Sequence, residues 1–352
     1  MIRKLLLQSC RILSILLFTS VCYGQKTVSI KTDPRVEALS IFFTLATADT
    51  LDTKPTPSVY YQEVKAYFKP YNDHPSLNWY RKLANWDGPD MASLGLFLSE
   101  TYPFKLERKP EIDYVRNSEM DTFICRFNAF YKDCRVAKFI TKQHSQYEKI
   151  DKRAERYLEK NGILHTVDSF YKSKQKLEYL IYTDFLCNHG SNAIKSGDEK
   201  FAGKIIIKAG YIEDKAKQLN MNSPVNFEPA PNVIAHECSH IYLKNFLKDY
   251  HDRLFAIRTI FLTTATGKTL ADKQWENEVD ELLVRVCVAK ILAQRYGKES
   301  GNIEIANQAK HFKLATALYS FMDTYTQNTS RYHMIEEFYP ELILFLENKA
   351  RL

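Results

Sequence analysis

The run NVIAHECSHIYLK, residues 232–244, most constrains what this chain can form. It places His236 and His240 four residues apart, with Glu237 directly after the first histidine. Residues four apart lie one turn apart on the same face of an α-helix, so both imidazoles can reach one ion. Pro231 stands just before the run and is typical of a first helical turn, which favours a helix that begins there.

This HExxH pattern is typical of zinc sites on helices. Zinc accepts neutral imidazole and carboxylate ligands and, in catalytic sites, keeps one position for water. His236 and His240 are therefore the expected ligands, and Glu237 is the expected general base. Histidines that are hydrogen-bonded within a core are the alternative. We expect the histidine face to be turned towards the interior, because it continues with three apolar residues, Val233, Leu243 and Leu247.

A third protein ligand is expected in the segment QWENEVDELLVRVCVAKIL, residues 274–292, which is typical of a helix. Its start carries four carboxylates: Glu276, Glu278, Asp280 and Glu281. In one register Glu276 acts together with Asp280. In the other, Glu281 is the ligand and Arg285, one turn later, holds its carboxylate in place. The residues alone leave both registers open.

Two resemblances bear on this choice. A distant glutamate on a following helix completes the HExxH site of the gluzincin metallopeptidases, and this arrangement resembles theirs; Glu276 with Asp280 is similar to the second motif of thermolysin-like enzymes. The HExxH and the stretches DPRVEALSIFFTLA, VKAYFKPYNDHPSL and WENEVDELLVR also resemble an uncharacterised family of secreted bacterial proteins, known only as a domain of unknown function. In that family's pattern the acidic position stands two after a valine and four before an arginine. The resemblance implies Glu281 as the third ligand, with Arg285 beside it.

The order of the expected elements predicts a mostly helical α+β fold. Helical patterns dominate from Asp33-Pro34 to about residue 161 and resume from Pro231 to the end. Between them, three segments are rich in β-branched and aromatic residues and predict two or three strands of a small sheet: 163–173, 176–186 and 200–210. The gluzincin resemblance implies a zincin-like core at 162–352, behind a helical N-terminal region at 25–161.

Residues 1–24 have the pattern of a secretory signal peptide, with a basic start and an apolar run that ends in small residues. The apolar run is shorter than the roughly 20 residues of a membrane helix, and no later segment approaches that length. Cleavage after Gly24 leaves a secreted or periplasmic protein without an integral membrane segment. Lipidation at Cys22 is an alternative, which the bulky Val21 before it disfavours.

Charge and cysteines exclude two classes of protein. The net charge falls from +7 to +4 when the three basic residues of the signal are removed. The remaining basic residues alternate with acidic ones, so no nucleic-acid partner is expected. An odd number of cysteines remains, which is not a disulfide framework: Cys125, Cys134, Cys187, Cys238 and Cys287. Cys238 stands within the HExxH, where the resembled family usually has an aromatic residue, and is expected to pack inertly; a thiol that competes for zinc is the alternative.

Four further residues have weaker patterns. His74, in YNDHPSL, is expected either at the edge of the cleft or as a turn residue at a helix start. Tyr211, Tyr332 and His333 are candidates for stabilising an oxyanion. The gluzincin resemblance also implies that the strand at 200–210 lines the cleft and pairs with an extended peptide; an ordinary strand of a small sheet is the alternative.

Together these features predict a secreted zinc metallopeptidase that acts on a peptide or protein substrate, with Glu237 as general base. One alternative is a catalytically inactive envelope binding protein that keeps the zincin-like scaffold. Another is a helical structural protein without a metal. An intact Glu237 argues against the inactive protein, because metal binding alone does not require a base.

Overall fold

The computed structural model describes residues 28–47, 57–83, 88–108, 110, 119–172, 177–186, 190–194, 199–210, 220–225 and 229–351. The predicted signal peptide at 1–24, with Cys22, lies outside these residues, as do Tyr211 and Cys187. Within the described part, no helix is long and apolar enough to cross a membrane.

The fold is α+β and mostly helical, as the sequence predicts. The strands are β1 (Val28–Lys31), β2 (Glu178–Asp184), β3 (Asn192–Ala193) and β4 (Lys204–Gly210). The helices of the N-terminal half are α2 (Pro34–Thr47), α3 (Val59–Phe68), α4 (Pro75–Arg81), α5 (Met120–Asp133), α6 (Val136–Asn161) and α7 (Ile163–Tyr171). Those of the C-terminal half are α8 (Pro231–Asp249), α9 (His251–Ala256), α10 (Trp275–Tyr296), α11 (Lys298–Gln308), α12 (Ala315–Phe321), α13 (Asp323–Gln327) and α14 (Tyr339–Ala350).

The four strands form one sheet in the order β1-β2-β4-β3. β1, β2 and β4 run parallel, and the two-residue β3 pairs antiparallel with β4. Ile30, Ile181 and Ile207 stand opposite one another across the three parallel strands, and all three are buried. Strands buried on both faces have nearly continuous apolar sequences, which accounts for the runs that predicted β2 and β4 correctly.

The strand predicted at 163–173 is wrong, because Ile163–Tyr171 form the helix α7. Gly162 separates α6 from α7 with a left-handed φ of 70°, and its N–H closes α6 by donating to the Leu158 carbonyl at 3.0 Å. The β-branched and aromatic content of this stretch favours a strand. Its apolar residues nevertheless recur with helical spacing, and the buried ones are Ile163, Leu164, Val167, Phe170 and Tyr171.

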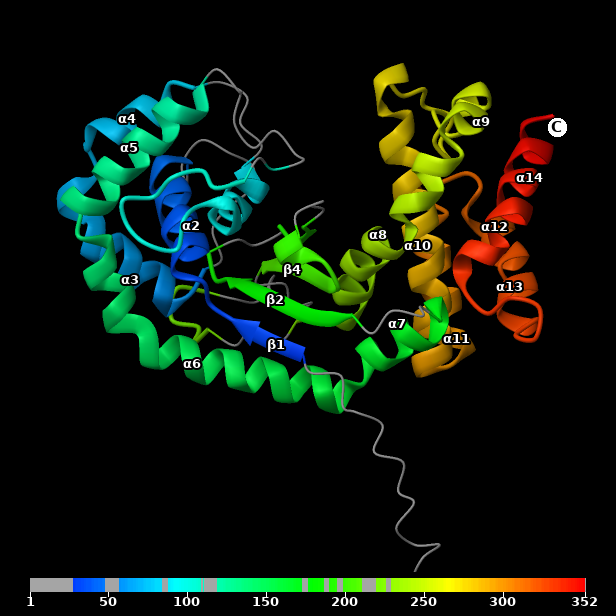
Figure 1. Cartoon of the computed structure of the whole chain (residues 1–352), viewed down its shortest axis with the longest axis horizontal. Coiled ribbons are helices and arrows are strands. Elements are labelled where there is room, and N and C mark those ends of the chain that lie inside the picture. The colour runs from blue at the N-terminus through cyan, green and yellow to red at the C-terminus, as the bar shows by residue number, and fades with distance from the viewer. Residues whose placement is uncertain are drawn as a thin grey trace, which may run out of the picture.

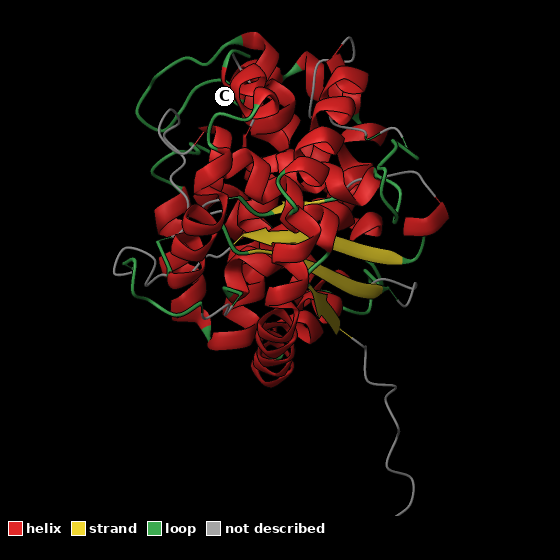
Figure 2. Ribbon diagram, turned by 90° about the vertical axis from the view of Figure 1, so that its left-hand side faces the viewer, coloured by secondary structure: helices red, strands yellow, loops and turns green. Residues whose placement is uncertain are grey.

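Helices cover both faces of the sheet (Figures 1 and 2). α2 packs on β2 from the side of the N-terminal helices, whereas α8 packs on β3 and β4 and is backed by α10. In Figure 1, α2 to α5 lie on the left of the sheet and α7 to α14 on the right. The predicted boundary at 161/162 falls between α6 and α7, and the sheet joins the two regions because β1 pairs with β2.

The outer edge of β1 is capped by side chains of α6. The Ile30 N–H donates to Glu155 Oε1 at 3.0 Å, and the Thr32 N–H donates to Asp151 Oδ2 at 2.8 Å. Glu155 and Asp151 stand one helical turn apart, which matches the two-residue spacing of outward N–H groups along a strand. Two carboxylates therefore satisfy the backbone donors of this edge.

A buried carboxyl group lies between α2 and the sheet. Glu37 is fully buried, and its Oε1 accepts a hydrogen bond from the Tyr60 hydroxyl. Burial, and next the nearby Asp184 carboxylate, raise the pKa of Glu37 to about 8. Glu37 is therefore held mostly protonated at neutral pH.

Candidate metal centre

Helix α8 carries the two histidines beside its buried face. Ile234, Cys238 and Tyr242 are buried among the neighbouring elements. The side chains of His236 and His240 remain 12% and 13% exposed. The histidine face is thus turned only partly inward, and His236 and Val233 on it line a cavity.

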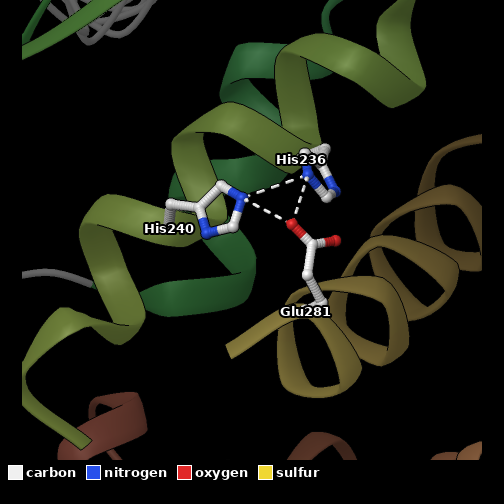
Figure 3. A group of neighbouring side chains, drawn as sticks. All are labelled: His236, His240 and Glu281. Atoms are coloured by element: carbon white, nitrogen blue, oxygen red, sulfur yellow. Dashed lines mark hydrogen bonds and ion pairs between the residues drawn. The ribbon is translucent and has the colours of Figure 1, made fainter. Parts of the chain in front are cut away.

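The structure brings the three predicted ligands together between α8 and α10 (Figure 3). The two histidine Nε2 atoms are 3.1 Å apart. Glu281 Oε1 lies 3.7 Å from His236 Nε2 and 3.6 Å from His240 Nε2. Among the residues that the structure describes, this is the one group of three histidine, cysteine, aspartate or glutamate side chains close enough to share an ion.

The donor set and its spacing fit zinc. Tetrahedral zinc with bonds of about 2.0–2.1 Å separates its nitrogen and oxygen ligands by about 3.3 Å, close to the three distances here. Burial, and to a smaller extent Arg285 and His240, lower the pKa of His236 to about 2. Its imidazole is therefore neutral, which is the form that binds a metal.

Two neighbouring side chains orient these donors. Asp280 Oδ2 lies 2.9 Å from His240 Nδ1, so the ring donates its Nδ1–H to this carboxylate and leaves the Nε2 lone pair towards Glu281. Arg285 Nε donates to Glu281 Oε2 at 3.1 Å, so the other oxygen of Glu281 faces the histidines. His236 Nδ1 is buried and has no hydrogen-bond partner among the described residues.

Glu237 is close to the predicted ligands and nearly enclosed. Its exposed fraction is 5%, and its carboxylate accepts a hydrogen bond from the Ala193 N–H of β3. Burial raises the pKa of Glu237 to about 7, against the opposing effects of His240, the Ala193 N–H and Lys208; Glu281 adds to the rise. A carboxyl group with a pKa near 7 can both accept and release a proton at neutral pH.

A buried lysine fixes the segment around β3, whose Ala193 N–H donates to Glu237. Lys208, on β4, is fully buried, and its ammonium group donates to the Gly190 carbonyl. It also lies 3.5 Å from Asp184 Oδ2, which compensates its charge. Lys208 thereby holds the chain just before β3 against the sheet.

A cavity of about 300 Å³ lies next to His236 and Glu281. It is lined by four of the residues described above: His236, Glu237, Glu281 and Arg285. The other lining residues come from the residue before β3 and from α8, α10 and α11: Ser191, Asn232, Val233, Val288 and Glu304. The predicted base and two of the predicted ligands thus face one accessible space. No sequence pattern predicts Ser191, Asn232 and Glu304 as lining residues, because only the packing of distant elements brings them to the cavity.

Glu276 and Glu278, the other two carboxylates at the start of α10, lie away from His236 and His240. Glu276 is exposed and lies 3.1 Å from His251 Nε2. With Glu281 as the ligand, Glu278 is expected at an exposed or rim position. It is instead buried, and its Oε2 lies 3.3 Å from His311 Nε2. In the register of the structure, therefore, Glu281 and not Glu276 faces the two histidines.

His74 does not line the cavity. It precedes α4, and its Nδ1 accepts the Ser76 N–H at 3.2 Å, the geometry of a turn residue that caps a helix. Tyr332 packs against Tyr325 and Phe338, and the His333 N–H donates to Glu337, so neither residue reaches the cavity. Cys238 is fully buried and is not among the three clustered donors.

The strand at 200–210 differs from its expected role. β4 lies inside the sheet, between β2 and β3, so Ile207 and Lys208 already pair with β3. The strand that ends the sheet on the side of α8 is β3. An extended peptide would meet β3 before β4.

Comparison with known proteins places the chain in one family. No curated protein and no solved structure matches it. The family model described as domain of unknown function DUF4932 matches residues 87–345. The match includes α8 and α10, with the clustered histidines and glutamates, and spans most of the chain. The chain therefore belongs to the DUF4932 family.

Proposed function

We propose that this protein is a secreted zinc-dependent metallopeptidase. The observation that carries the proposal is the convergence of His236, His240 and Glu281 at 3.1–3.7 Å, with the buried Glu237 facing the same cavity. The resemblance to gluzincins and the signal-peptide pattern at 1–24 support it.

His236, His240 and Glu281 would hold the zinc ion, with Asp280 and Arg285 orienting two of them. When bound, zinc would polarise the scissile carbonyl and acidify a water molecule. Glu237 takes the proton of the attacking water on its carboxylate and passes it to the leaving amine. General acid–base catalysis of this kind contributes about 10²- to 10⁴-fold.

The Ala193 N–H and burial prepare Glu237 for this role. The hydrogen bond from β3 fixes one side of the carboxylate, and burial keeps its pKa near 7. The substrate class we propose is an extended peptide, which would lie in the cavity beside Glu237.

The test compares wild type with Glu237→Gln for metal content and for hydrolysis of a peptide library. The amide is nearly isosteric but cannot accept a proton, so we expect the variant to keep zinc and to lose hydrolysis by at least about 10²-fold. Loss of zinc in the variant would show that Glu237 is a ligand. A wild type that binds zinc but cleaves no peptide would instead favour the inactive envelope binding protein.

A further inference from the structure

A second cavity lies on the far side of α10 from the metal centre and is richer in basic residues. Its volume is about 550 Å³, and its lining residues come from α7, α10, α11, α12 and α13 and the residues next to them. Figure 1 shows where these helices lie. Three lysines line it, Lys172, Lys290 and Lys298, against one aspartate, Asp323. Among the residues that the structure describes, no other charged side chain lines it, so the described lining carries a net charge of +2.

Two of the lysines are held in place by the fold. Lys290 is 7% exposed, and its ammonium group lies 2.7 Å from Asp323 Oδ1 and 3.7 Å from the centre of the Tyr319 ring. Lys172 donates to the Tyr332 carbonyl at 3.0 Å and lies 5.0 Å from the centre of the Tyr325 ring. An ammonium group has three donors, and these contacts leave N–H groups of both lysines for a ligand.

The backbone at Lys172 is also unusual. This residue ends α7 with a left-handed φ of 52°, a conformation that favours glycine or asparagine. Burial lowers the pKa of Lys172, while the Glu337 carboxylate opposes that effect. A partly desolvated ammonium group gains more from a nearby anion than an exposed one does.

The rest of the lining suits an organic molecule. The aromatic residues Phe170, Tyr319 and Tyr325 and the aliphatic Ala293 contribute apolar surface, while Thr326 and Thr329 add hydroxyl groups. A volume of this size falls within the range of about 300–1,000 Å³ that is typical of small-molecule sites and exceeds what an inorganic ion fills.

We propose that this cavity, which we call the lysine cavity, binds a small organic dianion, either a phosphate monoester or a dicarboxylate. The net charge of +2 of the described lining fits two negative charges, and all three lysines line the same space. The aromatic and hydroxyl groups contact the remainder of the molecule. This inference does not depend on the proposed peptidase activity.

The test is calorimetric titration of the mature protein with glucose 6-phosphate and, separately, with glutarate. Both titrations are done at constant ionic strength with protein dialysed against metal-free buffer, so that no free metal ion binds the probe. We expect saturable binding of at least one probe at one site per chain. Stronger binding of glucose 6-phosphate would identify a phosphate monoester, and stronger binding of glutarate a dicarboxylate.

Charge-matched variants decide whether the lysine cavity is responsible. Lys172→Gln and Lys298→Gln should each weaken binding about tenfold or more. Lys310→Gln removes the same charge from an exposed lysine outside the cavity and should bind as wild type does. Unchanged melting temperatures would show that the variants are folded. Absence of saturable binding of both probes, or equal weakening in Lys310→Gln, would overturn the proposal.

Discussion

Asp280 and His240 form a pair in which Asp280 Oδ2 lies 2.9 Å from Nδ1 of the ring. The next residue on the same helix, Glu281, lies 3.6 Å from Nε2 on the other side of that ring. Consecutive carboxylates of α10 thus contact opposite nitrogens of one imidazole. In the proposed metal site, the first would fix the tautomer and orientation in which the second nitrogen can bind the ion.

Asp280→Asn tests this relationship. An amide can still contact the ring but no longer provides a negative charge, so we expect zinc affinity to fall about 10- to 100-fold, with stoichiometric zinc retained at saturating metal. Competition with a chelator of known affinity measures the change. Complete loss of metal would make Asp280 a ligand, and an unchanged affinity would remove it from the site.

The third-ligand assignment predicts a contrast along α10. Glu281→Ala should abolish stoichiometric zinc, and Arg285→Ala should weaken binding only partly, because it leaves the carboxylate misoriented. Glu276→Ala is the matched control: Glu276 is exposed and pairs with His251, so this variant should keep its zinc. Metal analysis of the purified variants reads out all three. Loss of zinc in Glu276→Ala but not in Glu281→Ala would select the thermolysin-like register.

Metal removal should act on stability as well. A ligand that binds only the native state stabilises it by mass action, by about 2.7 kcal/mol at a hundred times its dissociation constant. A chelator should therefore lower the melting temperature of wild type by several degrees. The double variant His236→Ala with His240→Ala should show no response. Equal shifts in both proteins would argue against a metal at these histidines.

The buried Glu37 predicts how stability depends on pH. Its pKa is raised from 4.5 to about 8 in the folded protein, so its contribution is complete below about pH 4.5 and is lost as pH rises towards 8. At about 1.4 kcal/mol per pKa unit, the loss is on the order of 5 kcal/mol. Glu37→Gln stays neutral and should lose less stability than wild type between pH 5 and pH 8. Chemical denaturation of both proteins at several pH values measures this difference, and parallel pH profiles would contradict it.

The sequence predicted those elements whose local pattern and packing agree. The HExxH spacing and Pro231 placed α8, and the continuous apolar runs placed β2 and β4. α7 was misread because its β-branched and aromatic composition opposes its helical spacing, and the contacts of the helix with neighbouring elements decide between the two. The resemblance implied Glu281, but the residues alone could not choose it over Glu276. The two residues are five positions apart and lie on different faces of α10, so the rotation of α10 against α8 decides which one faces the histidines.

Other parts of the site depend on contacts between segments far apart in the chain. The Ala193 N–H reaches Glu237 only because β3 pairs with β4 and α8 packs on both. The burial of Lys208 could not be predicted, because the sequence around it, IIIKAG, is typical of an ordinary strand. Its role follows from Asp184 and the Gly190 carbonyl, which no local pattern connects to it.

The carboxylates that cap β1 limit where another strand can be added to the sheet. With the Ile30 and Thr32 N–H groups bound to Glu155 and Asp151, another chain cannot add a strand at that end without first displacing α6. The opposite end terminates in the two-residue β3, next to Glu237. A carboxylate from a helix therefore holds a backbone donor at each edge of the sheet, so strand addition by a second copy would have to displace a helix side chain at either end.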